Sequence, residues 1–347
     1  MIAADRPYRI VSIGGGTGLS ALLAGLKRFV RPDSDPAVDI RAVVTVTDDG
    51  GSSGRLRREF DMLPPGDIRN CLVALSEDEA LLSRLFQYRF KGGRGLKGHS
   101  FGNLFLTALT HITGDFPEAI KLSSEVLKIG GAIYPSTSAD VMLEAELVDG
   151  TRVTGETKIS RSKARIDRIR LRPRNCKPLP ETLDAIRDAD LITLGPGSLF
   201  TSVIPNLLVE GIPEAIRRSP AVKAYFVNLM WQPGETMSFT ASDHVKAICR
   251  HAGDNFIDYA LVNIRAIPKP LRRRYARESA MPVEVDLDEL KLLGLEVVAG
   301  NLLQEGEMAR HSSEAIASLA VQLAREGRLR RELAATEAQR SRWRGRR

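Results

Sequence analysis

The sequence lacks the features that mark a membrane-spanning, secreted or disulfide-stabilised protein. Its 347 residues include three cysteines, Cys71, Cys176 and Cys249, with neither a CxxC pair nor a metal-binding spacing. It contains no run of about 18 apolar residues, and the N-terminal MIAADRPYR has no apolar signal-peptide core. We therefore expect a cytoplasmic protein with reduced thiols and no membrane span.

Acidic residues are too few at the C-terminal end to balance the positive charge there. Residues 324–347 contain nine arginines and three glutamates, a net +6 of the +7 that the whole chain carries. We expect this segment to be a basic tail that is disordered or a frayed helix. Such a tail contacts RNA, acidic partners or lipid head groups weakly. The nearly neutral remainder does not predict specific nucleic-acid binding.

Short apolar runs followed by helical patterns predict the fold class. YRIVSI (8–13) precedes a glycine turn and a helical repeat of leucines, and IRAVVTVT (40–47) is apolar like a buried parallel strand. Further buried strands, each beside a helical segment, are expected over 189–195, 221–230 and 256–263. This alternation predicts an α/β, Rossmann-like, doubly wound and mainly parallel sheet.

One segment breaks the alternation. Residues 136–173 contain VMLEAELVDGTRVTGETKI, which alternates and carries an Asp-Gly turn signal, and then KARIDRIRLRP. We expect an antiparallel β insertion there. It separates a first Rossmann-like half with the phosphate loops (8–135) from a second α/β half with C-terminal helices (181–320).

The glycine turn GGGTGLSA follows the first strand and opens a helix. It fails the strict GxGxxG pattern, but Gly16-x-Gly18-x-x-Ala21 satisfies the looser dinucleotide pattern in the required context. Glycines let the backbone approach a diphosphate, and the helix N-terminus supplies N–H donors and positive potential. The alternatives are a merely tight turn or a phosphate site made of Gly14, Gly15, Gly16, Thr17 and Gly18.

The second loop, TDDGGSSGRLR, places Asp48 and Asp49 after the second strand, where a nicotinamide site needs one acid. Adjacent side chains on a strand point to opposite sides. One acid can therefore bind a ribose hydroxyl, a uracil edge or Mg²⁺, while the other caps the turn. The residues that follow offer backbone N–H groups, hydroxyls and a guanidinium fork to an anion; they are Gly51, Ser52, Ser53 and Arg55.

Two further motifs each begin an expected helix. PPGDIRN places Asp67, Arg69 and Asn70 at a helix start, where Asp67 is either a ligand group or an N-cap. GHSFGN sets His99 and Asn103 before an apolar helix. His99 is a general base, a phosphate ligand or a local capping residue, and the sequence alone identifies no partner for it.

Polar residues also follow two later strands. A second glycine turn, LGPGSLF, presents Gly197 and Ser198 at the carboxyl edge of the expected sheet, where open α/β sheets bind ligands. Asn228, Gln232 and Glu235 follow the next strand end. They either face the same crevice or belong to a long polar loop.

Taken together, GGGTGLS, TDDGGSSGRLR, PPGDIRN, GHSFGNL, GPGSLFTSVIPNLLV and NLMWQPGET resemble the YvcK-type gluconeogenesis factor family, within the CofD-like superfamily of the 2-phospho-L-lactate transferases. The motifs run in order from about residue 9 to residue 312. The resemblance implies a Rossmann-like fold, a cytoplasmic location and binding of a UDP-sugar such as UDP-N-acetylglucosamine. It also implies a role that links carbon metabolism to cell-wall synthesis and cell shape. We further expect protein partners in cell-wall synthesis and a homo-oligomer.

Carried over onto this sequence, the resemblance implies that the glycine turn, the Asp48-Asp49 loop and Asn228 surround the nucleotide sugar. Tyr275 in RRYARESAMPVEVD and Arg310 in MARHSSEAI match family positions near it. Trp231 stands where the family has threonine, which leaves the local packing open. The C-terminal arginine tail lies outside the family pattern.

Three functional hypotheses remain. The leading one is a regulatory UDP-sugar-binding protein that requires no cofactor and has no assigned catalytic residue. The alternative is a CofD-like enzyme, in which Asp48 and Asp49 orient Mg²⁺ for phosphoryl transfer. A third is an NAD-binding protein, based on Gly16-x-Gly18-x-x-Ala21 alone.

Overall fold

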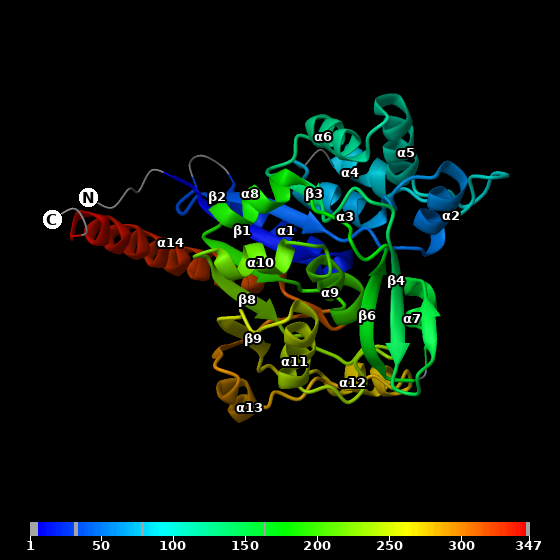
Figure 1. Ribbon diagram of the computed structural model, residues 1–347. Coiled ribbons are helices and arrows are strands. Elements are labelled where there is room, and N and C mark those ends of the chain that lie inside the picture. Colours follow the sequence, from blue (N-terminus) through cyan, green and yellow to red (C-terminus); the bar gives the residue numbers. More distant parts are fainter. Residues whose placement is uncertain (1–5, 31–33, 78–79, 163, 345–347) are drawn as a thin grey trace.

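Seven parallel strands form the centre of the protein, as the computed structural model shows for residues 6–30, 34–77, 80–162 and 164–344 (Figure 1). The strand order is β10-β9-β8-β7-β1-β2-β3. The bounds are β1 (Tyr8–Gly14), β2 (Val38–Val44), β3 (Ala132–Pro135), β7 (Leu191–Leu194), β8 (Val222–Phe226), β9 (Tyr259–Asn263) and β10 (Glu296–Gly300). The predicted doubly wound α/β fold is confirmed.

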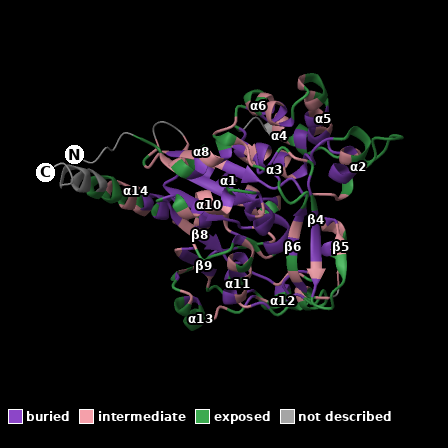
Figure 2. Ribbon diagram, viewed as in Figure 1, coloured by how far each residue is buried: buried purple, intermediate pink, exposed green. Residues whose placement is uncertain are grey.

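Helices cover both faces of the sheet, so its central strands are buried throughout (Figure 2). One face is covered by α1 (Gly16–Leu26), α3 (Gly66–Leu75) and α14 (Ser313–Arg344). The other is covered by α8 (Pro180–Asp188), η2 (Leu199–Val203), α9 (Ile204–Leu207), α10 (Ile212–Arg218) and α11 (Ala241–Ala252). Burial on both faces explains why these strands read as continuous apolar runs.

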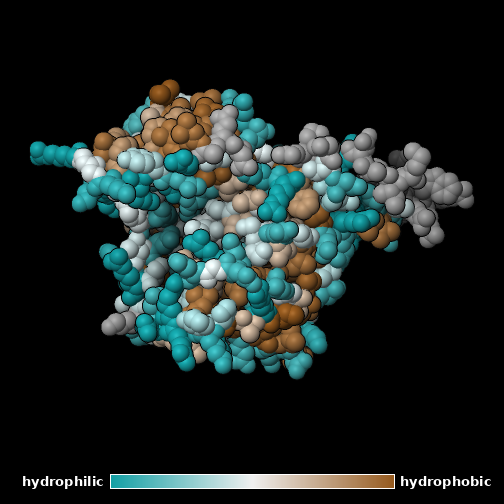
Figure 3. All heavy atoms as spheres, turned by 180° about the vertical axis from the view of Figure 1, so that it is seen from behind, coloured by the Kyte–Doolittle hydropathy of each residue, from teal (hydrophilic) through white to brown (hydrophobic). Residues whose placement is uncertain are grey.

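Besides α3, the crossover from β2 to β3 contains four helices: α2 (Gly51–Phe60), α4 (Ala80–Gln87), α5 (Phe101–Thr113) and α6 (Phe116–Val126). The C-terminal half contains two further helices and two short strands: α12 (Lys269–Ala276), α13 (Leu287–Leu292), β11 (Leu303–Gln304) and β12 (Arg310–His311). A short 3-10 helix, η1 (Lys27–Phe29), follows α1. Seen from behind, apolar side chains gather at the top of the molecule, over α4 and α5 (Figure 3).

The alternating segment forms the expected antiparallel sheet. Its strands are β4 (Met142–Leu147), β5 (Arg152–Thr154) and β6 (Ile166–Arg172), in the order β5-β4-β6. A single-turn helix, α7 (Glu156–Ile159), follows β5. Because β4 lies in the middle, its apolar residues Leu143 and Ala145 are fully buried.

The segment from residue 324, expected to be a disordered tail or a frayed helix, is helical through Arg344 and continues α14, which begins at Ser313. Arg328 donates to the Asp190 carboxylate at 2.6 Å, and Arg331 approaches the same carboxylate at 3.6 Å. Asp190 precedes β7 and is only 2% exposed. Several of the arginines therefore neutralise acids of the body, which composition could not reveal. Residues 345–347 lie outside the described residues.

Within the described ranges, no single helix is long and apolar enough to cross a bilayer. A bent pair, Leu199–Leu207 with Ile212–Arg218, reaches the required length only by joining two segments at 75°.

Candidate functional site

A cavity of about 520 Å³, here called the glycine cavity, lies at the carboxyl ends of the central strands. The turns after β1 and β7 form one part of its wall, and these two strands are neighbours at the point where the strand order reverses. This is the switch point at which open α/β sheets bind ligands. The loop after β8 and the segments around residues 275–280 and 308–311 complete the wall.

The first glycine turn has the backbone geometry that its sequence requires. Gly16 has φ +63°, in the left-handed region that favours glycine. A Cβ on Gly18 would lie 2.5 Å from the Pro196 carbonyl oxygen, so the two glycine turns touch here. Gly15, Gly16, Thr17 and Gly18 line the cavity, whereas Gly14 is the buried last residue of β1.

The second glycine turn is tied to the loop after β8 by side-chain hydrogen bonds. Gln232 Nε2 donates to Ser198 Oγ at 2.6 Å, and Asn228 Nδ2 donates to Gln232 Oε1 at 3.0 Å. Asn228 Oδ1 is buried and accepts no hydrogen bond from the described residues. Because an unpaired buried acceptor is costly, this oxygen is suited to receive a ligand N–H. Gly197, Ser198 and Asn228 all line the cavity.

Besides the exposed Glu278, two carboxyl groups face the cavity without a basic partner among the described residues. Glu235, 5% exposed, accepts from Ser160 Oγ, Thr201 Oγ1 and the Phe200 N–H at 3.2, 3.2 and 3.3 Å. Burial outweighs these bonds and raises the pKa of Glu235 to about 7. Burial, and then the charge of Asp48, raises the pKa of Glu156 to about 9. Glu156 is therefore largely protonated at neutral pH.

Asp49 lies outside the cavity wall and holds α7 in place. Its Oδ1 accepts from the Thr157 N–H at 2.9 Å and from the Thr157 hydroxyl at 2.6 Å. Since α7 begins at Glu156 and is followed by Ser160, Asp49 positions two cavity-lining residues. Asp48 Oδ1 accepts from the Gly50 N–H at 2.9 Å, a local turn. The two acids therefore have different partners, but β2 ends at Val44, so this is not the alternation of a strand.

Asp67 connects the Asp48 loop with the glycine cavity. It lies in the first turn of α3, whose N-cap is Pro65, so the N-cap interpretation of Asp67 is wrong. Its carboxyl group instead accepts from the Gly16 N–H, and burial followed by the Asp48 charge raises its pKa to about 7. One N–H of the glycine turn is thus already occupied.

The other predicted residues gather in a second cluster, beside Asp48 and away from the cavity wall. Ser52 Oγ lies 2.9 Å from His99 Nδ1, and Asn103 Nδ2 donates to Ser52 Oγ at 3.0 Å; all three residues are buried. Burial, then the charge of Arg55, lowers the pKa of His99. His99 is not the cap of α5, because that residue is Ser100.

The remaining members of this cluster make local bonds. Arg55 donates to the Lys97 carbonyl at 2.8 Å and Arg69 to Asn70 Oδ1 at 2.6 Å. Ser53 is buried beside the start of α3, where a Cβ on Gly66 would lie 2.4 Å from Ser53 Oγ and 2.7 Å from Asp48 Oδ2. Gly51 opens α2 with φ +46°.

Tyr275 and Arg310 both line the glycine cavity. The Ala309 N–H donates to Tyr275 Oη at 3.2 Å and joins the two segments. Arg310 makes no ion pair within the described residues, so its charge is available to an anion. Trp231 packs into the wall: its Nε1 donates to the Phe239 carbonyl at 3.0 Å, which answers how a tryptophan is accommodated there.

Sequence reasoning missed several residues that the structure brings to the cavity. Glu156 and Ser160 come from the β insertion, and no local pattern indicates that α7 reaches the switch point. Others include Met230, Glu278, Met308 and His311. His311 is buried at 9% exposure, and burial lowers its pKa to about 4.

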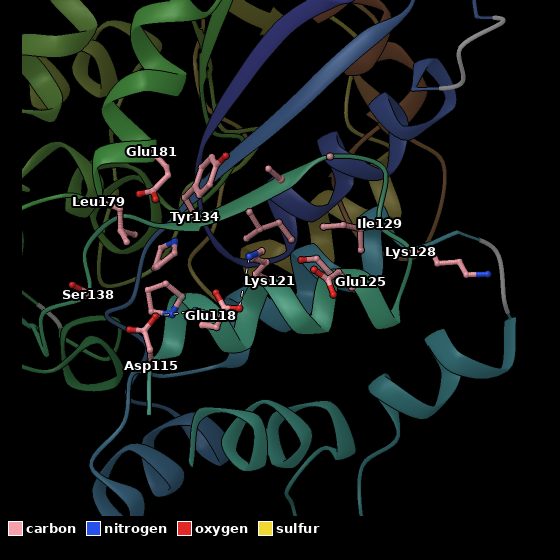
Figure 4. Close-up of a pocket in the computed structure, with 16 residues that line it drawn as sticks. Asp115, Glu118, Lys121, Glu125, Lys128, Ile129, Tyr134, Ser138, Leu179 and Glu181 are labelled. Atoms are coloured by element: carbon pink, nitrogen blue, oxygen red, sulfur yellow. Dashed lines mark hydrogen bonds and ion pairs between the residues drawn. The ribbon is translucent and has the colours of Figure 1, made fainter. Parts of the chain in front are cut away.

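A larger cavity of about 790 Å³ lies elsewhere, between α6 and the edge strand β3 (Figure 4). It contains neither glycine turn and none of the predicted site residues. Two of the charges on its rim pair with each other, Lys121 with Glu118 at 3.7 Å. Volume alone therefore does not identify the functional site.

Among the described residues, no group of three or more His, Cys, Asp or Glu side chains is arranged to hold a metal ion. The three cysteines are free thiols, and none lines the glycine cavity.

Sequence comparisons show which proteins this chain is similar to. The family model of 2-phospho-L-lactate transferase CofD matches residues 10–303. The gluconeogenesis factor of Bacillus subtilis (strain 168) is 52% identical over 319 residues, which cover 92% of this chain and 98% of that protein. The gluconeogenesis factor of Halalkalibacterium halodurans is 50% identical over 308 residues, covering 88% and 94%.

A solved structure is also similar. The crystal structure of a UPF0052 family protein from Bacillus halodurans has a TM-score of 0.87 and 49% identity. The matched region covers 91% of this chain and 99% of the Bacillus halodurans chain.

Proposed function

Because this chain belongs to the CofD family and is about half identical to gluconeogenesis factors, we propose that it is a cytoplasmic regulatory protein that binds a UDP-sugar of the UDP-N-acetylglucosamine class. In this role it links carbon metabolism to cell-wall synthesis and cell shape, through protein partners in that pathway. The observation that carries the proposal is the glycine cavity at the switch point. It combines a helix N-terminus, an arginine without an ion-pair partner among the described residues, and two carboxyl groups with a raised pKa.

The diphosphate binds at the amino end of α1. The helix has 11 residues, and Gly16 and Gly18 in its first turn line the cavity without side chains, while Thr17 between them offers a hydroxyl. Arg310 supplies a guanidinium on the opposite segment. The volume of the glycine cavity, about 520 Å³, is within the range typical of small-ligand sites.

The raised pKa values of Glu156 and Glu235 make the cavity compatible with a bound diphosphate. Two ionised glutamates would repel a diphosphate, but Glu156, with a pKa raised to about 9, is protonated at neutral pH. Glu235, with a pKa of about 7, is about half protonated. A protonated carboxyl donates a hydrogen bond, so both suit sugar hydroxyls or an acetamido oxygen. Asn228 Oδ1 then accepts from a base or amide N–H.

The transferase alternative is less favoured by the contacts. A CofD-like reaction through Mg²⁺ would use Asp48 and Asp49, but both are engaged by Gly50 and Thr157. The NAD alternative rests on the glycine turn alone.

Calorimetry distinguishes the three hypotheses. We expect UDP-N-acetylglucosamine to bind the full chain without Mg²⁺, and NAD and GDP to bind far more weakly. Gly18→Ala should abolish the UDP-sugar signal, because its Cβ would meet Pro196. Binding of NAD with no response to UDP-sugars would refute the proposal. A strict Mg²⁺ requirement with release of a phosphate-linked group would favour the enzyme.

A further inference from the structure

A second pocket, here called the basic pocket, lies at the outer edge of β6 and contains no residue of the glycine cavity. Its volume is about 240 Å³. Four arginines line it: two on β6, one just after β6, and one on α11. They are Arg168, Arg170, Arg174 and Arg250. Arg168 and Arg170 belong to the alternating basic run KARIDRIRLRP, which the nucleotide-sugar site does not use.

The charge of this pocket is only partly neutralised. Arg170 pairs with Glu146 at 2.7 Å and Arg250 with Asp167 at 2.8 Å. Arg168 and Arg174 are exposed and have no hydrogen-bond or ion-pair partner within the described ranges. The pocket therefore carries two positive charges beyond those that its own acids balance.

The walls of the basic pocket are fixed by His251. Its Nε2 accepts from the Ile169 N–H of β6 at 3.0 Å, and its Nδ1 bonds to the Ala247 carbonyl at 2.7 Å within α11. Both ring nitrogens are engaged, and burial lowers the pKa of His251 to about 4. The histidine is thus a neutral clamp, and only the arginines supply charge.

We propose that the basic pocket binds a phosphate or diphosphate group of a small ligand, independently of the glycine cavity. Guanidinium groups match phosphate oxygens with paired N–H donors and stay charged at any physiological pH. The volume is below the roughly 300 Å³ at which typical small-ligand sites begin. The pocket therefore accommodates the phosphoryl group, and the rest of the ligand extends into solvent.

The test titrates inorganic pyrophosphate into the full chain at low salt, with UDP-N-acetylglucosamine present throughout to occupy the glycine cavity. We expect Arg168→Gln/Arg174→Gln to weaken pyrophosphate binding at least ~10-fold, because both unneutralised charges are lost. Arg187→Gln/Arg218→Gln is the control, since it removes the same charge from exposed positions on α8 and α10. Absence of pyrophosphate binding, or equal weakening in both variants, would overturn the proposal. UDP-sugar affinity measured alone tests the glycine cavity separately.

An independent observation concerns the exposed apolar patch over α4 and α5 (Figure 3). We define this apolar patch by Phe60, Leu81, Leu85 and Ile112, which are 43%, 77%, 39% and 78% exposed. It continues onto half-buried residues of α5, a helix without Asp, Glu, Lys or Arg. Contiguous exposed apolar surface of this kind often marks an interaction site.

We infer that a second copy of this chain covers the apolar patch. The surrounding charges are of both signs: Arg84 lies on α4, whereas Glu59 and Asp61 flank Phe60, whose ring contacts His111 at 5.4 Å. An anionic membrane would need a positive rim. A rim with charges of both signs instead lets opposite charges of the two copies meet across a two-fold axis. A standard interface of this kind buries ~800 Å² on each partner.

Light scattering coupled to size exclusion tests this inference. The wild-type chain should have twice the 38.1 kDa mass of one copy. Leu81→Glu/Ile112→Glu should give monomers with an unchanged circular dichroism spectrum. Leu292→Glu, at an 80% exposed leucine on α13, should stay dimeric. A wild-type monomer at all concentrations, or a dimer that survives the double substitution, would contradict the inference.

Discussion

The Asp49 carboxylate accepts two hydrogen bonds from Thr157, at 2.9 Å from its N–H and at 2.6 Å from its hydroxyl. This contact joins the loop after β2 to the β insertion, 108 residues later in the chain. Asp49 therefore acts on the glycine cavity through α7, as a positioning residue.

Asp49→Ala should weaken UDP-sugar binding without removing any group from the cavity wall, because α7 would lose its anchor. We expect about a tenfold loss of affinity and a loss of about 1–2 kcal/mol in the free energy of unfolding. Calorimetry and urea denaturation measure the two effects. Thr157→Val should act in the same direction.

The double variant, Asp49→Ala/Thr157→Val, separates positioning from direct contact. Residues that act through one shared contact are non-additive, so the double variant should resemble Asp49→Ala. Additive losses of affinity would instead mean that Asp49 touches the ligand.

Gly18→Ala should destabilise the protein as well as prevent ligand binding. The new Cβ would meet the Pro196 carbonyl group and the Gly197 nitrogen, both of them backbone atoms that cannot rotate away. Overpacking of this kind typically costs about 1–3 kcal/mol, which urea denaturation would detect. Gly92→Ala is the matched control, since an added Cβ there meets no atom within 4 Å. Equal stability of the two variants would show that the turns can separate.

The acids in the cavity wall make stability depend on pH in a defined direction. The pKa of Glu156 rises from 4.5 to about 9 on folding, so between these values the folded state binds more protons than the unfolded state. The free energy of unfolding should therefore fall as pH increases across this window. Urea denaturation at several pH values would show a shallower fall in Glu156→Gln, which cannot ionise. An unchanged slope would mean that Glu156 is ionised in the folded protein.

The fold and the glycine turns could be predicted because their causes are local. Buried parallel strands need apolar runs, and the turn after β1 needs glycine at Gly16 for its positive φ. The position of Asp49 could not be predicted, because both a ligand and Thr157 would select a carboxylate there. The place of Glu156 in the cavity wall could not be predicted either, because only the three-dimensional path of the insertion brings α7 to the switch point. The role of Arg328 was hidden because composition does not show that a buried acid, Asp190, lies opposite.

Arg328→Ala should be among the most destabilising substitutions in α14. Asp190 is 2% exposed, and Arg328, with a side chain 16% exposed, supplies its close ion pair at 2.6 Å. Removing one partner of a buried pair leaves an unbalanced charge and typically costs about 3–5 kcal/mol; Arg331, at 3.6 Å, should reduce that loss. Arg187→Ala breaks an exposed pair with Asp184 instead, which is worth about 0–1 kcal/mol. Urea denaturation should therefore separate the two variants clearly, and Asp190→Asn should recover part of the stability lost in Arg328→Ala. Equal stability of Arg328→Ala and Arg187→Ala would mean that α14 does not need this ion pair to stay on the sheet.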